Sequence, residues 1–347
     1  MSAPEIAVAW LSPANPPFRV SGFAWYGVEG KYRRLPQAPR LPIPPVVDKF
    51  ANCTSGGQIR FRTDSSLLAV KVKLSGLADL NNMPATSQCG FDCYIDIEDQ
   101  RLFHSTTRYD HTKRDYEMVM YEKMERQPRA VTLYFPLYQG VEEVQIGLDP
   151  DADVSEPGKY ASDKRVIVYG TSITQGASAA RPGMSYTNIL SRRIPLEFIN
   201  LGFSGSGRGE PELAKLVSDI SGPACLVLDY EANCPSPEHM EKTLPEFIRI
   251  YRDVHPDVPI LVLSKIRYAR ELFDDALLEK RLRMQRFQRE TVERLNRQGD
   301  RNIYFYDGSG LLGANFHECT VDGVHPTDLG FMRMADGLTP VLQKLLQ

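Results

Sequence analysis

Short apolar runs alternate with longer helical stretches from about residue 160 to the C-terminus, and this alternation constrains the fold most. Five runs read as strands: 165–169, 198–201, 224–228, 259–263 and 303–306. Helical stretches are predicted between and after them at about 183–193, 210–219, 238–252, 271–298 and 327–346. Strands that are apolar along nearly their whole length, with helices between them, are typical of a parallel sheet covered on both faces. The pattern predicts an α/β fold for this part of the chain.

Residues 1 to about 150 have a different pattern. Strands with period-two alternation are predicted at 58–62 and 68–74, and further short strands at 91–97, 116–121, 130–135 and 143–148. Several short strands separated by turns indicate an antiparallel, jelly-roll-like β-sandwich. The prolines between Pro13 and Pro45 predict extended segments and turns and are taken to exclude helix.

The two patterns predict two domains, a β-sandwich at 1–155 and an α/β domain at 160–347. The acidic segment 149–163 is the predicted linker, and it is expected to be a loop. A length of 347 residues agrees with two domains, at about 150 residues each.

Composition excludes several classes of protein. Lys and Arg number 41 against 44 Asp and Glu, so the basic excess of a nucleic-acid-binding or anionic-membrane-binding surface is missing. No run reaches the roughly 18 apolar residues of a membrane span. The N-terminus has no basic region, and its apolar run Ile6–Leu11 is too short for a leader. A cytoplasmic location is expected by default, or a secreted or periplasmic one if a leader has been removed.

The six cysteines are too sparse for a disulfide scaffold. Cys89 and Cys93, with His104 and His111 downstream, fit no standard zinc spacing. We therefore predict neither a metal nor a cofactor.

Polar residues follow the predicted parallel strands at the points where the strands end. Ser172 follows the first strand, Gly205 lies in a glycine-rich turn after the second, and Asn233 follows the third. Asp322 and His325 come after the fifth strand, across a loop. Active groups gather at the carboxyl ends of the strands in an open α/β sheet. A serine, a glycine turn, an amide and an Asp-x-x-His there supply the parts of hydrolysis through an acyl-enzyme.

Each residue also has a structural interpretation. Ser172 could be a helix N-cap, and the turn at 202–207 could hold a phosphate, although it lacks the lysine of a P-loop. Asn233 could be a turn residue, His325 could be structural, and His317 is the main rival base. The joint position and order of the residues favour the catalytic interpretation.

The segment 160–347 resembles the SGNH hydrolase superfamily, also called GDSL-type esterases, whose four blocks carry Ser, Gly, Asn and His in that order. Ser172 in Gly-Thr-Ser-Ile, Gly205, Asn233 and the sequence Asp-Gly-Val-His-Pro around His325 match these blocks. The aspartates that usually precede the serine and follow the asparagine are Thr171 and Cys234 here. The resemblance implies a flavodoxin-like five-stranded parallel sheet.

The first half of the chain carries a second resemblance, in Trp25 and the segments 32–36, 60–65 and 136–141. These look like the β-sandwich domain that precedes the hydrolase domain in one bacterial group, whose members are similar to carbohydrate acetylesterases. The implied activity is hydrolysis of O-acyl, and foremost O-acetyl, esters on a carbohydrate. A lipase, lysophospholipase or thioesterase of the same superfamily and an inactive glycan-binding protein are the alternatives. The expected partner is an acylated small molecule or glycan, with no nucleic acid or membrane, and the oligomeric state stays open.

The chemistry of ester hydrolysis then assigns a role to each residue. Ser172 is the predicted nucleophile, His325 the general base, and Asp322 the carboxylate that orients the imidazole. The backbone N–H groups of Ser172 and Gly205 and the side-chain amide of Asn233 are the predicted oxyanion donors.

Overall fold

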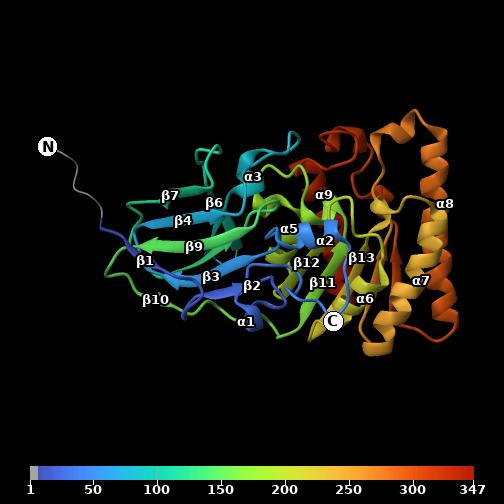
Figure 1. Ribbon diagram of the computed structural model, residues 1–347, viewed down its shortest axis with the longest axis horizontal. Coiled ribbons are helices and arrows are strands. Elements are labelled where there is room, and N and C mark those ends of the chain that lie inside the picture. The colour runs from blue at the N-terminus through green and yellow to red at the C-terminus, as the bar shows by residue number, and fades with distance from the viewer. Residues whose placement is uncertain (1–6, 99) are drawn as a thin grey trace.

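A β-rich half and an α/β half lie along the long axis of the molecule in the computed structural model, which describes residues 7–98 and 100–347 (Figure 1). The start of the run Ile6–Leu11 lies outside the described residues. No described helix is both long and apolar enough to cross a membrane.

The first half contains two antiparallel sheets. One has the order β1–β9–β4–β7, with bounds Ala9–Leu11, Val141–Leu148, Leu68–Leu74 and Asp115–Tyr121. The other has the order β10–β3–β8–β5–β6, with bounds Val154–Ser155, Gln58–Thr63, Arg129–Tyr134, Asp92–Ile97 and Gln100–Thr106, and β2 (Arg19–Ser21) also pairs with β3. This is the predicted β-sandwich.

Period-two alternation builds the core between these sheets. Val70 and Val72 of β4 point into the same apolar cluster as Ile59 and Phe61 of β3, and all four are buried. Alternate residues of a strand face opposite sides of a sheet, so Arg60 and Arg62 lie on the outer face of β3.

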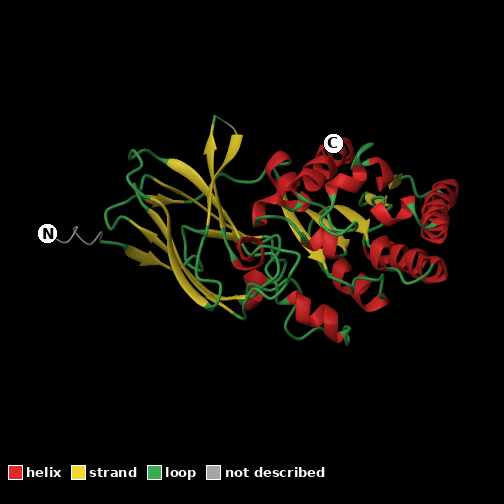
Figure 2. Ribbon diagram, turned by 90° about the horizontal axis from the view of Figure 1, so that it is seen from above, coloured by secondary structure: helices red, strands yellow, loops and turns green. Residues whose placement is uncertain are grey.

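The second half is a five-stranded parallel sheet of order β12–β11–β13–β14–β15, which confirms the predicted flavodoxin-like topology. Its strands span Glu197–Gly202, Arg165–Gly170, Pro223–Asp229, Ile260–Leu263 and Ile303–Tyr306. Helices cover both faces of this sheet (Figure 2). They are α4 (Ser172–Gln175), α5 (Tyr186–Arg193), α6 (Pro211–Ser218), α7 (Pro237–Val254), α8 (Asp275–Arg297) and α9 (Asp328–Leu345).

The near-continuous apolar character of the strands follows from this double coverage. In β11, Val166 and Val168 pack in one cluster with residues of α5 and α9. Ile167 and Tyr169 pack in the other cluster, with residues of α6, α7 and α8. Neighbouring positions of the strand are therefore buried on opposite faces, as in other parallel sheets.

The exclusion of helix from the proline-rich segment is wrong. Short helices form at α1 (Tyr26–Glu29) and α2 (Pro45–Ala51), and Pro45 is the first residue of α2. A proline at this position costs nothing, because the first helical N–H has no intrahelical acceptor and the ring already fixes a helical φ. Helix α3 (Ala85–Cys89) and strand β6 were not predicted, and two residues of the expected loop 149–163 form β10.

A buried arginine joins the two halves. The Arg34 side chain is 1% exposed and donates to the carbonyl oxygens of Phe50 and Cys53, at 2.6 and 2.9 Å, in its own half. It also donates to the carbonyl oxygen of Gly202, at the end of β12, and its guanidinium lies over the Phe203 ring, 4.9 Å from the centroid. Burial lowers its pKa to about 10, which leaves the group charged at neutral pH.

Arg34→Met keeps the length of the side chain and removes its donors. Several buried carbonyl oxygens would lose their partner, so we expect the free energy of unfolding to fall by about 3 kcal/mol or more. Chemical denaturation measures the change, and Arg108→Met, at an exposed arginine, is the control. A loss equal to that of the control would contradict the bridging role of Arg34.

Candidate active site

Ser172 lies at the carboxyl end of β11, where the chain turns directly into α4. The N-cap of this helix is Thr171, whose hydroxyl accepts the Ile173 N–H, and Ser172 is the first helical residue. The N-cap interpretation of Ser172 is therefore wrong, because the preceding threonine caps the helix. The Ser172 hydroxyl stays available, and the side chain lies in a site where the residue is only 8% exposed.

The structure brings Ser172, His325 and Asp322 together across 150 residues of sequence. Ser172 Oγ lies 2.9 Å from His325 Nε2, and His325 Nδ1 lies 2.7 Å from Asp322 Oδ2. A neutral imidazole that donates from Nδ1 to the carboxylate has Nε2 free as an acceptor. His325 Nε2 can therefore accept the proton of the Ser172 hydroxyl.

The turn before His325 fixes the Asp322 carboxylate. The backbone N–H groups of Val324 and His325 donate to Asp322 Oδ1 at 3.1 and 2.8 Å, and Gly323 between them has a φ of 85° that favours glycine. Burial alone would raise the pKa of Asp322, but these two N–H groups and the imidazole outweigh it and hold the pKa below its usual value. The carboxylate stays ionised over the neutral range.

Gly205 lies in the turn after β12 with a φ of 63°, in the left-handed region. A Cβ added there would meet no atom within 4 Å, so the conformation rather than crowding requires glycine. In the described part of the chain, no hydrogen-bond acceptor is found for the backbone N–H groups of Gly205 and Ser172. Both N–H groups can therefore donate to a bound group.

Asn233 ends the short 3-10 helix Glu231–Asn233 that follows β13. Its side-chain amide donates to the carbonyl oxygens of Phe203 and Gly207, at 3.0 and 3.3 Å. The amide thus holds both ends of the turn that carries Gly205. Its predicted direct contact with an oxyanion stays a prediction.

His317, the rival base, and two further carboxylates that could orient a histidine, Asp307 and Asp328, have other partners. The His317 side chain is 43% exposed, and its Nδ1 lies 3.4 Å from Oε1 of the adjacent Glu318. Asp307 caps a 3-10 helix through the Ser309 N–H, and Asp328 accepts the Ala180 N–H. Neither carboxylate bonds to His325.

Asp229 is a second carboxylate beneath the serine turn, to which the sequence analysis gave no role. It is buried at the end of β13 and accepts the Thr174 and Tyr186 hydroxyls at 2.8 and 2.7 Å. The Thr174 hydroxyl in turn accepts the Thr171 N–H at 3.2 Å. Burial raises the pKa of Asp229 to about 7. An acidic residue ending an otherwise apolar strand was the available signal.

The first half of the chain also reaches the site. Tyr138 is 7% exposed, and its hydroxyl donates to the Ser172 carbonyl oxygen at 3.4 Å. The Asn82 amide lies 3.5 Å from Asp322 Oδ2 and 3.4 Å from Ser178 Oγ. Neither residue carries a local pattern that points to the site.

Gln175 of α4 connects the serine turn, the Gly205 turn and the first half of the chain. Its side-chain amide donates to the Leu137 carbonyl oxygen at 3.2 Å, and its side-chain oxygen accepts the Ser204 N–H at 3.1 Å. The Ser55 hydroxyl donates to the backbone carbonyl oxygen of Gln175 at 2.6 Å. One residue of α4 therefore links the serine turn to the Gly205 turn and to the sandwich.

Metal-ligating side chains do not gather in the described residues: residues 7–98 and 100–347 contain no group of three or more His, Cys, Asp or Glu that could hold a metal ion. Cys89 and Cys93 are buried free thiols. Ser172, His325 and Asp322 can carry out acyl chemistry with protein groups alone.

A parallel sheet of this order, with serine and histidine joined at its carboxyl edge, is the architecture of the SGNH class of hydrolases. Residues 163–343 match the GDSL-like lipase/acylhydrolase family, and residues 8–154 match the N-terminal region of SGNH-hydrolase-type esterases. The chain belongs to the GDSL-like lipase/acylhydrolase family, and it is an acyl ester hydrolase.

Solved structures share both halves of the fold. A protein from Bacteroides ovatus ATCC 8483, described as GDSL-like, is 32% identical, with a TM-score of 0.90 and 98% of each chain covered. The salicylyl-acyltransferase SsfX3 of a tetracycline biosynthetic pathway is 21% identical, with a TM-score of 0.76 and 97% of each chain covered. A family two carbohydrate esterase from Cellvibrio japonicus is 14% identical, with a TM-score of 0.64 and 98% of each chain covered. A search of curated proteins finds no match.

Asp229→Asn tests the buried carboxylate. A folded-state pKa of about 7, above the unfolded value of 3.8, gives a stability contribution that is fully present below pH 3.8 and is lost as the pH rises through 7. Asparagine does not titrate, so we expect the wild type to lose about 3–4 kcal/mol relative to the variant across this range. Denaturation of both proteins from pH 4 to 8 measures it, and a constant difference would contradict the assigned pKa.

Proposed function

We propose that this acyl ester hydrolase removes O-acetyl groups from a carbohydrate through an acyl-enzyme on Ser172. The observation that carries the proposal is the continuous contact from Ser172 Oγ to His325 Nε2, at 2.9 Å, and from His325 Nδ1 to Asp322, at 2.7 Å. A serine hydroxyl needs such an adjacent base to attack an ester at neutral pH.

In the first half-reaction, Ser172 Oγ attacks the ester carbonyl carbon as its proton passes to His325 Nε2. Asp322, held ionised by the turn at 322–325, stabilises the imidazolium. The tetrahedral intermediate collapses when the ester C–O bond breaks, and the imidazolium gives its proton to the departing sugar oxygen, which leaves as a hydroxyl. The acetyl group is then bonded to Ser172.

In the second half-reaction, water takes the place of the sugar hydroxyl. His325 accepts a proton from the water as the water oxygen attacks the acyl carbon, and the proton then returns to Ser172 Oγ as acetate leaves. Both half-reactions use the same base, so one imidazole and one orienting carboxylate suffice.

The negative charge of each tetrahedral intermediate requires donors fixed in advance. The unpartnered N–H groups of Ser172 and Gly205 supply two of them in the proposed mechanism. The Asn233 amide fixes the Gly205 turn through the carbonyl oxygens of Phe203 and Gly207, and it is the third proposed donor.

The polarity of the surroundings supports a small acyl group on a polar carrier. Two polar side chains of the first half hydrogen-bond to the proposed catalytic residues: the amide of Asn82 to Asp322 and the hydroxyl of Tyr138 to the Ser172 carbonyl oxygen. A long acyl chain would require an apolar groove instead. The two-part fold shared with family two carbohydrate esterases agrees with a carbohydrate substrate.

Ser172→Ala removes the proposed nucleophile, and we expect kcat/KM for p-nitrophenyl acetate to fall roughly 10⁴-fold or more. Asn233→Ala removes a donor rather than the nucleophile, so it should leave a slow enzyme, with kcat lowered about 10²- to 10³-fold. Ser162→Ala, at an exposed serine, is the matched control. Full activity of the Ser172→Ala variant would remove the nucleophile assignment.

Acyl-chain length tests the substrate class. Across p-nitrophenyl esters from acetyl to decanoyl, we expect kcat/KM to be highest for acetyl and to fall with length, because the polar surroundings offer little apolar area to a long chain. Acetate release from acetylated oligosaccharides, measured beside Ser172→Ala, tests the carbohydrate.

A preference for decanoyl esters would favour a lipase, and no hydrolysis of any ester would favour a glycan-binding protein. Acetylated oligosaccharides that all stay intact while p-nitrophenyl acetate is cleaved would contradict the carbohydrate assignment alone.

A further inference from the structure

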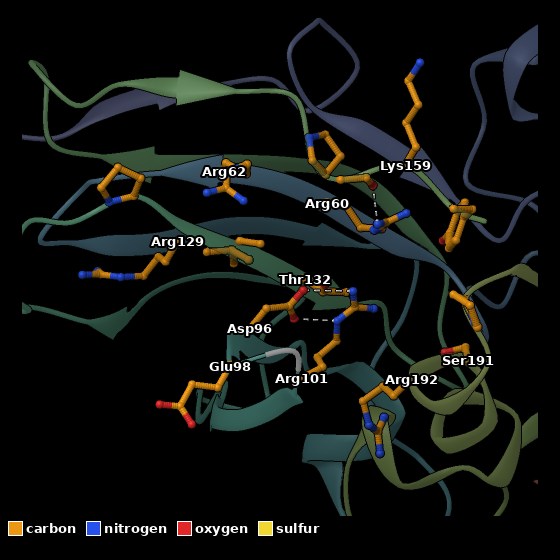
Figure 3. Close-up of a pocket in the computed structure, with 17 residues that line it drawn as sticks. Arg60, Arg62, Asp96, Glu98, Arg101, Arg129, Thr132, Lys159, Ser191 and Arg192 are labelled. Atoms are coloured by element: carbon orange, nitrogen blue, oxygen red, sulfur yellow. Dashed lines mark hydrogen bonds and ion pairs between the residues drawn. The ribbon is translucent and has the colours of Figure 1, made fainter. Parts of the chain in front are cut away.

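A cavity of about 550 Å³ lies between the outer face of the β10–β3–β8–β5–β6 sheet, the linker and α5 (Figure 3). Six cationic side chains and two acidic ones are among its lining residues, in a protein whose net charge is −3. The six are Arg60, Arg62, Arg101, Arg129, Lys159 and Arg192. The volume is within the range of small-molecule sites, about 300–1,000 Å³.

Strand alternation places two of these arginines together. Ile59 and Phe61 of β3 face the sandwich core, so Arg60 and Arg62 face the opposite side. They are paired across the sheet with Thr132 and Ala130 of β8. In Figure 3 the guanidinium groups of Arg60, Arg62 and Arg101 lie around one space. The alternating sequence of β3 thus supplies both a core and a cationic face.

Arg60 is the most informative of these residues, because its charge is buried without a counter-ion among the described residues. The residue is 6% exposed, its Nη2 donates to the Gly158 carbonyl oxygen at 2.7 Å, and its guanidinium lies 4.1 Å from the Tyr160 ring centroid. Its Nε and Nη1 have no hydrogen-bond partner, and no described carboxylate forms an ion pair with it. A buried cation with unsatisfied donors is costly unless an anion or acceptor completes its environment.

The other cationic side chains differ in how many of their N–H donors already have a partner. Arg101 is paired with Asp96 across β5 and β6, at 2.8 Å. Arg129 donates to the carbonyl oxygens of Ser65 and Glu125. Arg62 is exposed and forms no ion pair with any carboxylate that the structure describes. Arg60 and Arg62 therefore retain donors for a ligand.

We propose that this cavity is a binding site for a small ligand carrying an oxyanion group, a carboxylate, phosphate or sulfate. Guanidinium groups present planar, paired donors that match these groups, and charge-assisted hydrogen bonds of this kind are the strong ones. Arg62 approaches the anion from the open side, and Arg60 supplies the buried charge behind it. Thr132 of β8, the cross-strand partner of Arg60, also lines the cavity and adds a neutral hydroxyl donor.

The site is separate from the proposed active site. None of the residues that line the cavity is Ser172, His325, Asp322, Gly205 or Asn233. Binding there does not require ester hydrolysis, and a failure of the esterase proposal leaves this proposal unaffected.

Isothermal titration calorimetry of the full chain, in a buffer without oxyanions, tests the proposal. The probes are inorganic phosphate, sulfate and glucuronate, with glucose as the uncharged match for glucuronate. We expect saturable binding of at least one oxyanion and none of glucose. The oxyanion that binds identifies the source: glucuronate alone indicates an acidic sugar, and phosphate or sulfate indicates an esterified ligand.

Arg62→Gln removes an exposed charge without disturbing the core, and we expect it to weaken binding about tenfold, equivalent to about 1.4 kcal/mol. Arg60→Gln should abolish binding, and its circular dichroism shows whether it is folded. Arg108→Gln removes an exposed charge from the same half, outside the cavity lining, and should bind as the wild type does. Absence of saturable binding for all three oxyanions, or equal affinity in Arg62→Gln and Arg108→Gln, would overturn the proposal.

Discussion

The buried guanidinium of Arg34 is the interaction on which the relation between the two halves depends. It donates hydrogen bonds to carbonyl oxygens of the first half and to the carbonyl oxygen of Gly202 at the end of β12. One charged group therefore bonds to backbone acceptors of both halves. A cation with no carboxylate partner in the described part of the chain is tolerated there because carbonyl oxygens and the Phe203 ring surround it. Leu35, Val47 and Ala51 continue the junction as apolar contacts within the core cluster under α6, α7 and α8.

This junction explains why the site needs more than the parallel sheet. Gly202 begins the turn that carries Gly205. Arg34 holds the start of this turn by donating to the Gly202 carbonyl oxygen, and Gln175 holds it further along by accepting the Ser204 N–H. Gln175 is itself held by the Leu137 carbonyl oxygen and the Ser55 hydroxyl of the sandwich half. The first half therefore fixes the geometry of the turns from which the proposed oxyanion donors come.

The sequence predicted the parts of the molecule that depend on local periodicity. Strands β11 to β15 are apolar on both faces, and polar residues at their carboxyl ends must meet, so the proximity of Ser172, Asp322 and His325 could be predicted without coordinates. Asn82 and Tyr138 could not, because their contacts join segments far apart in the chain and leave no local pattern. The cationic cavity could not be predicted from the composition. The net charge of −3 describes the whole chain, whereas the alternation of β3 places Arg60 and Arg62 together on one face of the sheet.

Two carboxylates near Ser172 differ in their proton affinity, and the difference suits the proposed chemistry. Asp322 accepts backbone N–H groups and the imidazole N–H, which hold its pKa below the usual value, so it stays ionised beside the proposed base. Asp229 accepts only hydroxyls in a buried position, and burial raises its pKa to about 7. A second full charge beneath the serine turn would oppose the oxyanion that forms there, because like charges repel strongly where water is excluded. The same fold thus keeps one carboxylate ionised beside the proposed base and makes ionisation of the buried carboxylate costly.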